Sequence, residues 1–246
     1  MMFMDAGALA TEFPVGERQY FYFGFGSNEK DWLTELRKKV APVRFNIAAD
    51  AIVKELGIKS DTRVLEIGSG AGLLGQAIKE KSGSSSQYFS VELGESGARL
   101  SKDKGLEVVR ADAVRLPFSD GAFDVVVSTD VFEHIPDANG LSKEMQRVLK
   151  AGGKAFIVIA DPAEGRFDKT FDHIKRTKEN TDVQFWEKTF GDVGFELLPN
   201  SMKYRDRDVR KVFDLPVLRK LKEKPGFSCA FDLVSRPGVY ILEKNV

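Results

Sequence analysis

Val64-Leu65-Glu66-Ile67-Gly68-Ser69-Gly70-Ala71-Gly72 is the stretch of sequence that decides the fold. The apolar residues Val64, Leu65 and Ile67 are typical of a strand that is covered on both faces. The alternating glycines that follow permit positive φ angles and a close approach of the backbone to a ligand. Residues 73–80 predict a helix whose first amides face this turn, an arrangement that suits a nucleotide cofactor.

Two kinds of cofactor fit the turn. Residues 70–75 match the dinucleotide pattern G-x-G-x-x-G. Glu66 favours a different ligand, because a carboxylate at the end of the strand, facing the cofactor crevice, repels a pyrophosphate and attracts an ammonium or sulfonium group. The position of the strand agrees with this choice. In the dinucleotide pattern the strand would end just before Gly70, but here Gly68 and Ser69 stand between the apolar run and Gly70. The charge therefore favours S-adenosylmethionine over NAD.

Further motifs follow in order and give the chain a family resemblance. The segment 64–72 resembles motif I of class I S-adenosylmethionine-dependent methyltransferases, and the resemblance extends over about 60–160. The later matching motifs are a second strand at 87–92, an Asp112 segment, a fourth strand from Phe123 with an E-H-I-P-D loop at 133–137, and an L-K-x-G-G turn at 149–153 before a fifth strand at 155–160. The resemblance implies an α/β fold: a Rossmann-like, seven-stranded, mostly parallel sheet with helices on both faces and an antiparallel last strand.

The same resemblance implies a cofactor site. Glu66 and the glycines would hold the methionine portion of S-adenosylmethionine, Glu92 the ribose, and Asp112 with Ala113 the adenine. The expected cofactor residues are Glu66, Gly68, Ser69, Gly70, Gly72, Leu73, Glu92, Leu93, Asp112, Ala113, Ser128 and Thr129. S-Adenosylhomocysteine would be the product.

His134 and Asp130 are the candidate catalytic residues. The sulfonium is already a strong electrophile, so the protein must align the nucleophile, exclude water and, for a hydroxyl, remove a proton. His134 is the best candidate base because it follows the fourth strand and imidazole titrates near neutrality. It can equally orient its loop or pack beside the cofactor. Asp130 and Glu133 are alternatives, and each can instead bond nearby backbone amides.

Three regions are expected to shape the acceptor site. Residues 1–56 would form an N-terminal aromatic cap and helices, ahead of a cofactor-binding domain at 57–246 that contains variable substrate-side segments at 161–182 and 201–236. Within 20–25 every residue except Gly24 is aromatic, so this segment either packs on two sides or covers a pocket. The candidate acceptor contacts are Tyr20, Tyr22, Phe25, Glu133 and His173.

Periodicity and helix breakers predict the elements at both ends of the chain. Two helices are expected at 31–40 and 44–56, separated at Pro42. Near the C-terminus, 184–193 predicts a helix that ends at Gly194. The resemblance implies that strands at 195–199 and 239–243 pair as an antiparallel hairpin.

Composition and charge narrow the partners. The 246 residues contain 37 Lys plus Arg and 37 Asp plus Glu, so net charge gives no reason to expect a nucleic acid. Cys229 is the only cysteine, and neither a leader nor a membrane-spanning run is evident, so a cytoplasmic location is expected. Two distant histidines and one cysteine make no metal set, although scattered carboxylates can still bind Mg²⁺.

The expected function is methyl transfer to an O, N or C nucleophile of a small-molecule acceptor. Three alternatives stay open. A protein or RNA methyltransferase would use the segment 203–224, which carries nine basic and four acidic side chains. A noncatalytic partner would bind S-adenosylmethionine without turnover, and an NAD-dependent oxidoreductase is disfavoured by Glu66. The sequence identifies neither the acceptor nor the oligomeric state.

Overall fold

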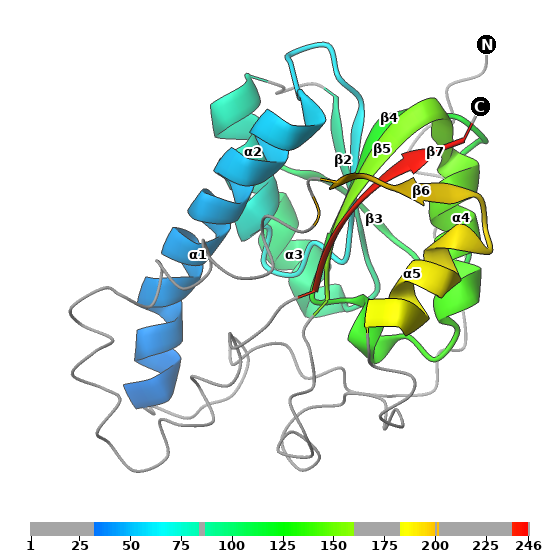
Figure 1. The fold of residues 1–246 in the computed structure, drawn as a ribbon. Helices are drawn as coiled ribbons and strands as arrows, with labels where there is room; N and C mark the ends of the chain where they lie inside the picture. The colour runs from blue at the N-terminus through cyan, green and yellow to red at the C-terminus, as the bar shows by residue number, and fades with distance from the viewer. Residues whose placement is uncertain (1–31, 84–86, 160–182, 200, 202–237, 246) are drawn as a thin grey trace.

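A computed structural model of the chain describes residues 32–83, 87–159, 183–199, 201 and 238–245, which form one sheet with helices on both faces (Figure 1). The strands are β1 (Val64–Ile67), β2 (Tyr88–Glu92), β3 (Glu107–Arg110), β4 (Phe123–Thr129), β5 (Leu149–Ile159), β6 (Phe195–Leu197) and β7 (Gly238–Lys244). The helices are α1 (Trp32–Leu56), α2 (Leu73–Ser82), α3 (Glu95–Asp103), α4 (Ala138–Val148) and α5 (Val183–Gly191), with a short 3₁₀ helix, η1, at Phe132–His134.

The strand order is β3-β2-β1-β4-β5-β7-β6. The first five strands run parallel, and β7 runs antiparallel to both β5 and β6. This confirms the predicted seven-stranded, mostly parallel sheet. The strand order reverses between β1 and β4, and open sheets of this kind bind ligands outside the carboxyl ends of the strands at such a reversal.

The last two strands form the predicted antiparallel pair. Ser201, just after β6, is fully buried and bonds to the backbone of Leu198, which follows β6, and of Ile241 in β7. Its Oγ donates to the carbonyl of Leu198 at 2.7 Å and accepts from the amide of Ile241 at 2.9 Å. The preceding helix, α5, ends at Gly191 rather than at the predicted residue 193, and β6 ends at Leu197 rather than 199.

Side chains alternate between two cores, one on each face of the sheet. On β1, Val64 packs into the core under α1, α2 and α3, which we call the α1–α3 face. Leu65 and Ile67 pack into the core under α4 and α5, which we call the α4–α5 face. This alternation follows from the period of two in a strand, and it places Glu66 on the α1–α3 face.

The helix break predicted at Pro42 is wrong, because α1 runs without interruption from Trp32 to Leu56. Proline has a helical φ angle, so it removes one backbone hydrogen bond without forcing the chain out of the helix. The second half of α1 packs Ala49, Ile52 and Leu56 into the α1–α3 core. That packing offsets the local cost of about 3 kcal/mol for an internal proline.

The turn predicted at 149–153 is also wrong, because these residues belong to β5. Leu149 pairs with Phe123 and Lys154 pairs with Val125, so residues 150–153 bulge out of the ladder. Gly153 is required there because a Cβ atom would lie 2.8 Å from the carbonyl oxygen of Lys150. The two glycines that suggested a turn thus serve a bulge within the strand.

Candidate functional site

The glycine turn after β1 is held against β2 by backbone hydrogen bonds. The amides of Gly68 and Ser69 both donate to the carbonyl of Val91, at 2.8 and 3.2 Å. Gly72 then starts α2 with a φ of 75°, and no side chain caps the helix at this residue. The first amides of α2 therefore face the turn, where they can bind a polar ligand.

Two of the glycines are required by neighbours that close in on the turn. A Cβ atom on Gly68, whose φ is 76°, would collide with the side chain of Val131, which follows β4. A Cβ atom on Gly72 would lie 2.9 Å from the Cα atom of Ser101 in α3. The Oγ of Ser101 also donates to the carbonyl of Gly70 at 2.8 Å. The turn is thus fixed by groups from β2, α3 and the loop after β4.

Glu92 connects the turn to the end of β2. Its Oε2 accepts from the amide of Gly70 at 2.9 Å, and its Oε1 accepts from the amide of Gly94 at 2.8 Å. The residue is 8% exposed. Two backbone bonds fix the orientation of the carboxylate, and each oxygen keeps a lone pair for a further donor such as a ribose hydroxyl. The next residue, Leu93, accepts from the Nε of Arg110 at 3.1 Å.

Glu66 is buried between the sheet and α2, with 2% of its surface exposed. The hydroxyl of Tyr88 donates to its Oε2 at 3.1 Å, and the Oγ of Ser90 lies 3.5 Å from the same atom. Burial raises the pKa of Glu66 to about 8, and the hydrogen bond from Tyr88 opposes this rise while the charge of Glu92 adds to it. At neutral pH the carboxyl is therefore mostly protonated until a cation approaches. Contact between Glu66 and a cofactor stays a prediction.

The end of β4 carries a strained residue and an isolated hydroxyl. Asp130 has a φ of 55°, the only positive value among the non-glycine residues that the structure describes. Its amide donates to the carbonyl of Val158 at 2.9 Å, which fixes this conformation against β5. Ser128 is fully buried, and its Oγ has no hydrogen-bond partner in the described part of the chain. Thr129, between them, is half-buried. Both features mark a site where stability has been given up locally.

The candidate bases follow in η1. His134 is half-buried, and its amide donates to the carbonyl of Val131 at 2.9 Å. Glu133 is 4% exposed, so little of its surface is open to an acceptor. The roles of His134, Asp130 and Glu133 stay predictions.

The adenine candidates lie after β3. Asp112 is exposed, and its Oδ1 accepts from the amide of Val114 at 3.1 Å. This bond leaves Oδ2 as the oxygen that can accept from an adenine amino group. Ala113 is 9% exposed and packs into the α4–α5 core. Other candidates lie outside the described residues: Tyr20, Tyr22, Phe25 and His173, with the segments 161–182 and 202–237.

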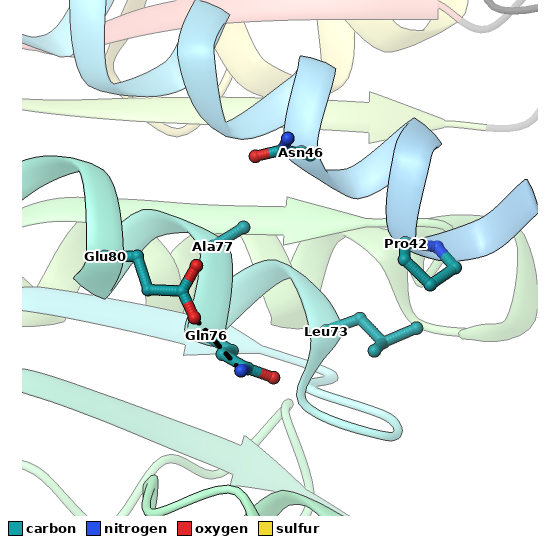
Figure 2. A pocket seen from close by; sticks show the side chains of 6 residues that line it. All are labelled: Pro42, Asn46, Leu73, Gln76, Ala77 and Glu80. Atoms are coloured by element: carbon teal, nitrogen blue, oxygen red, sulfur yellow. Dashed lines mark hydrogen bonds between the residues drawn. The ribbon is translucent and has the colours of Figure 1, made fainter.

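A hollow of about 310 Å³ separates α1 from α2. Figure 2 shows that the side chain of Leu73, at the start of α2, points toward Pro42 of α1. The other side chains that line the hollow are Asn46, Gln76, Ala77 and Glu80. The side chain of Leu73 thus faces α1, and its cofactor contact stays a prediction.

The described residues contain no cluster of metal ligands and no membrane-spanning helix. No three His, Cys, Asp or Glu side chains gather there in a way that could hold a metal ion. Over the same part of the chain, every helix is too short or too polar to span a bilayer.

The sequence-based prediction missed the residues that contact Glu66 and the glycine turn and hold them in place. Tyr88 and Ser90 bond to Glu66, Ser101 supports the turn, and Val131 covers Gly68. One signal was present, because Tyr88, Ser90 and Glu92 place polar groups at alternate positions of a strand that is otherwise apolar. A polar face on an inner strand indicates a buried partner, which here is Glu66.

Comparison with known proteins places the site in context. Residues 65–157 match the family model described as "Methyltransferase domain". A sarcosine/dimethylglycine N-methyltransferase of Halorhodospira halochloris is 31% identical in an alignment of 158 residues that covers 59% of this chain and 55% of that protein. A ubiquinone/menaquinone biosynthesis C-methyltransferase of Burkholderia ambifaria is 25% identical in an alignment of 231 residues that covers 83% of this chain and 89% of that one.

A solved structure supports the fold. It is a complex between the Haloferax volcanii Trm112 methyltransferase activator and the putative methyltransferase. The match has a TM-score of 0.62 at 16% identity, and it covers 85% of this chain and 93% of that chain. The chain matches just over half the length of the Halorhodospira relative. The residues that match the family model, 65–157, include the glycine turn and the strands around it.

Proposed function

This chain carries a class I S-adenosylmethionine-dependent methyltransferase domain, and from that premise we propose that it transfers a methyl group to an O, N or C nucleophile of a small-molecule acceptor. S-Adenosylmethionine supplies an electrophilic methyl group when bound. The new bond joins this methyl carbon to the acceptor atom, and the carbon–sulfur bond breaks with its electron pair left on sulfur. The released product is S-adenosylhomocysteine.

One observation carries the proposal: Glu92 is oriented by two backbone amides directly beside the glycine turn. A rigid carboxylate with free lone pairs next to open helix amides suits a ribose with two hydroxyls beside a polar amino-acid end. Glu66 on the neighbouring strand and exposed Asp112 extend this row of carboxyl groups along the carboxyl ends of the strands. Such a row attracts a cationic ligand, and the cation in turn favours the ionised form of Glu66.

The names of the relatives support a small acceptor. The Halorhodospira protein is named for sarcosine and dimethylglycine, and the Burkholderia protein for a step in ubiquinone and menaquinone biosynthesis. These acceptors differ from each other, so they support the size class rather than one compound.

His134 is the residue that we propose as the base for a protonated nucleophile. It lies on η1, directly after β4 and beside the strained Asp130. A positioned base contributes roughly 10² to 10⁴ in rate. His134→Gln should therefore lower kcat by about that factor for a hydroxyl acceptor. S-Adenosylhomocysteine affinity should stay within about twofold, because a base acts on the acceptor.

Calorimetry with S-adenosylhomocysteine and with NAD tests the cofactor. We expect saturable binding of S-adenosylhomocysteine and no binding of NAD. Glu92→Gln should weaken binding at least about tenfold, because it replaces a charged acceptor of hydroxyl bonds. Glu95→Gln is the matched control, since Glu95 lies three residues further on with its side chain 86% exposed. Binding of NAD in place of S-adenosylhomocysteine would overturn the proposal.

An acceptor screen scored by release of S-adenosylhomocysteine tests the reaction. Small amines, phenols and quinone precursors form one panel, and peptides and RNA form the other. Turnover confined to the small-molecule panel supports the proposal. Turnover confined to peptides or RNA contradicts the acceptor class, and tight cofactor binding without any turnover contradicts catalysis.

A further inference from the structure

Tyr88 is a buried tyrosine that the proposed reaction does not use directly. It starts β2, is 1% exposed, and packs under α2 in the α1–α3 core. Its hydroxyl donates to Glu66 at 3.1 Å, nearer than the hydroxyl of Ser90 at 3.5 Å. At this depth Tyr88 cannot touch a cofactor, so any effect on the site must pass through Glu66.

The surroundings of Glu66 make its carboxyl depend on hydroxyl donors from β2, of which Tyr88 is the nearer. The groups that face the carboxyl come from β2, namely Tyr88, Ser90 and Glu92. On the helix side, α2 presents Gly75, where a Cβ atom would lie 2.8 Å from the Oε2 of Glu66. On the sheet side, β4 presents Val127, which pairs with Glu66 and is fully buried. Neither neighbour offers a cation or a side-chain donor, so the ionised carboxylate relies on the hydroxyl of Tyr88 and, at a longer distance, on that of Ser90.

The hydrogen bonds from Tyr88 and Ser90 leave one carboxyl oxygen of Glu66 for a ligand. Both hydroxyls lie against Oε2, and no group within the described residues donates to Oε1. A hydrogen bond to one carboxylate oxygen fixes the plane of the group and thereby the direction of the other oxygen. Such a bond also favours the charged form over the neutral one.

We propose that Tyr88 is a positioning residue of the cofactor site, whose hydroxyl orients Glu66 and stabilises its ionised form when the ammonium end of the cofactor binds. The inference rests on the proposed function, because it requires a cationic ligand beside Glu66. Binding then converts a mostly protonated carboxyl into a carboxylate, so it releases a proton at neutral pH. Affinity should accordingly increase with pH between 6 and 7.5, by at most about tenfold per pH unit. This range lies below the titration of an α-amino group on the ligand.

Tyr88→Phe tests the proposal by calorimetry with S-adenosylhomocysteine over this pH range. The variant keeps the ring and removes the bond, which should raise the pKa of Glu66 further. We expect affinity to fall about tenfold at pH 6.5, since hydrogen bonds to charged groups are the strong ones. The dependence of affinity on pH should also shift to higher pH. Tyr240→Phe is the matched control, because Tyr240 is also 1% exposed but lies on the α4–α5 face.

Repeating the substitution in a Glu66→Gln variant separates a positioning role of Tyr88 from a packing role. In the Glu66→Gln variant no carboxylate can form, so adding Tyr88→Phe should change affinity by less than about twofold. A Tyr88→Phe effect of the same size in both backgrounds would show a packing role and overturn the proposal. Thermal unfolding of each variant confirms that the folded protein is being measured.

The outcomes distinguish this inference from the proposed function. A wild-type chain that binds no S-adenosylhomocysteine overturns the proposed function and the inference with it. Normal binding by the wild type, with an unchanged pH profile in Tyr88→Phe, overturns the inference alone. A carboxyl-carbon NMR titration of Glu66 in the ligand-free protein gives an independent measurement, in which Tyr88→Phe should move the titration to higher pH.

Discussion

The two faces of the sheet are built in different ways. The α4–α5 face packs aromatic rings, with Phe190 in contact with Phe132, Trp186 and Tyr240 at centroid distances of 5.5, 6.2 and 5.4 Å. The α1–α3 face instead buries the carboxyl of Glu66 next to the glycine turn. The difference indicates a division of labour, because apolar packing stabilises the fold whereas a buried carboxyl costs stability and suits a ligand site.

A substitution in the aromatic cluster of the α4–α5 face should have the largest effect on stability. Phe190 is 1% exposed, so Phe190→Ala should lower the free energy of unfolding by about 3–5 kcal/mol. The variant should still bind S-adenosylhomocysteine within about twofold when assayed well below its melting temperature, since its site residues are intact. Chemical denaturation measures the first quantity and calorimetry the second.

Phe185→Ala is the control for that prediction, because Phe185 lies on the same helix but is only half-buried. Its loss of stability should be clearly smaller. Equal losses in the two variants would show that the aromatic cluster does not depend on burial at Phe190.

The buried carboxyl should make stability depend on pH. The fold raises the pKa of Glu66 from 4.5 to about 8. The protonated folded form therefore contributes stability that is fully present below pH 4.5 and is lost as the pH rises toward 8. Each unit of pKa change corresponds to about 1.4 kcal/mol, so the loss should amount to a few kcal/mol by pH 8.

Glu66→Gln should remove this dependence and leave the variant more stable than the wild type at pH 8. Urea denaturation at a series of pH values from 5 to 8.5 measures the difference. Parallel stability curves for the two proteins would contradict the buried, protonated state of Glu66.

Gly75 and Gly191 compare a tightly packed helix position on the α1–α3 face with an exposed position at the end of α5. A Cβ atom on Gly75 would lie 2.8 Å from Glu66 and 2.9 Å from the Tyr88 ring, so Gly75→Ala should cost about 1–2 kcal/mol despite the better helix propensity of alanine. At Gly191 no atom lies within 4 Å of such a Cβ. Gly191→Ala should therefore stabilise the protein by roughly 0.5–1 kcal/mol. Changes of opposite sign in the melting temperatures of the two variants support this comparison, and changes of the same sign contradict it.

Ser128 is a polar residue on the otherwise apolar α4–α5 face. Its substitution should have the smallest effect on stability. Ser128 pairs with Ile67 on that side of the sheet, and its buried hydroxyl has no partner in the described part of the chain. Ser128→Ala should stabilise the protein by about 0.5–1 kcal/mol, because it removes an unsatisfied polar group.

Ser142→Ala is the control, since the equally buried Oγ of Ser142 donates to the carbonyl of Ala138 at 2.8 Å. It should give no such gain. If Ser128→Ala also weakens binding of S-adenosylhomocysteine, the isolated hydroxyl serves the ligand. A destabilised Ser128→Ala would show that the hydroxyl is bonded in solution.

The central part of the fold could be predicted from sequence because local signals agreed there. The run that ends in Ile67 is apolar, and the glycines of 68–72 permit only a tight turn, so β1 and the start of α2 lie where they were expected. Pro42 was misleading because its effect on a helix depends on the tertiary packing that α1 makes further along. The glycines of 149–153 were misleading because a bulge and a turn need the same residues.

The candidate site was predictable only in outline. The chain order of Glu66, Glu92 and Asp112 placed these side chains at the ends of β1, β2 and β3. The partner of Glu66 could not be predicted, because it depends on the register that sets Glu66 opposite Ser90, with Tyr88 on the same face. Register between parallel strands is decided by the whole sheet, so the residues that tune the charge stayed hidden.

Ser201 anchors the start of the long connection that leads to β7, and this affects how easily the length of that connection can change. It bonds to the β7 backbone at Ile241, and β7 begins opposite Ile159 at the edge where the parallel strands end. The chain between residues 201 and 238 thus starts and finishes at anchored points. Doubling the length of such a connection costs only about 0.6 kcal/mol in closure entropy. Insertions and deletions between these two points can therefore accumulate over evolution at little thermodynamic cost while the glycine turn and the sheet stay unchanged.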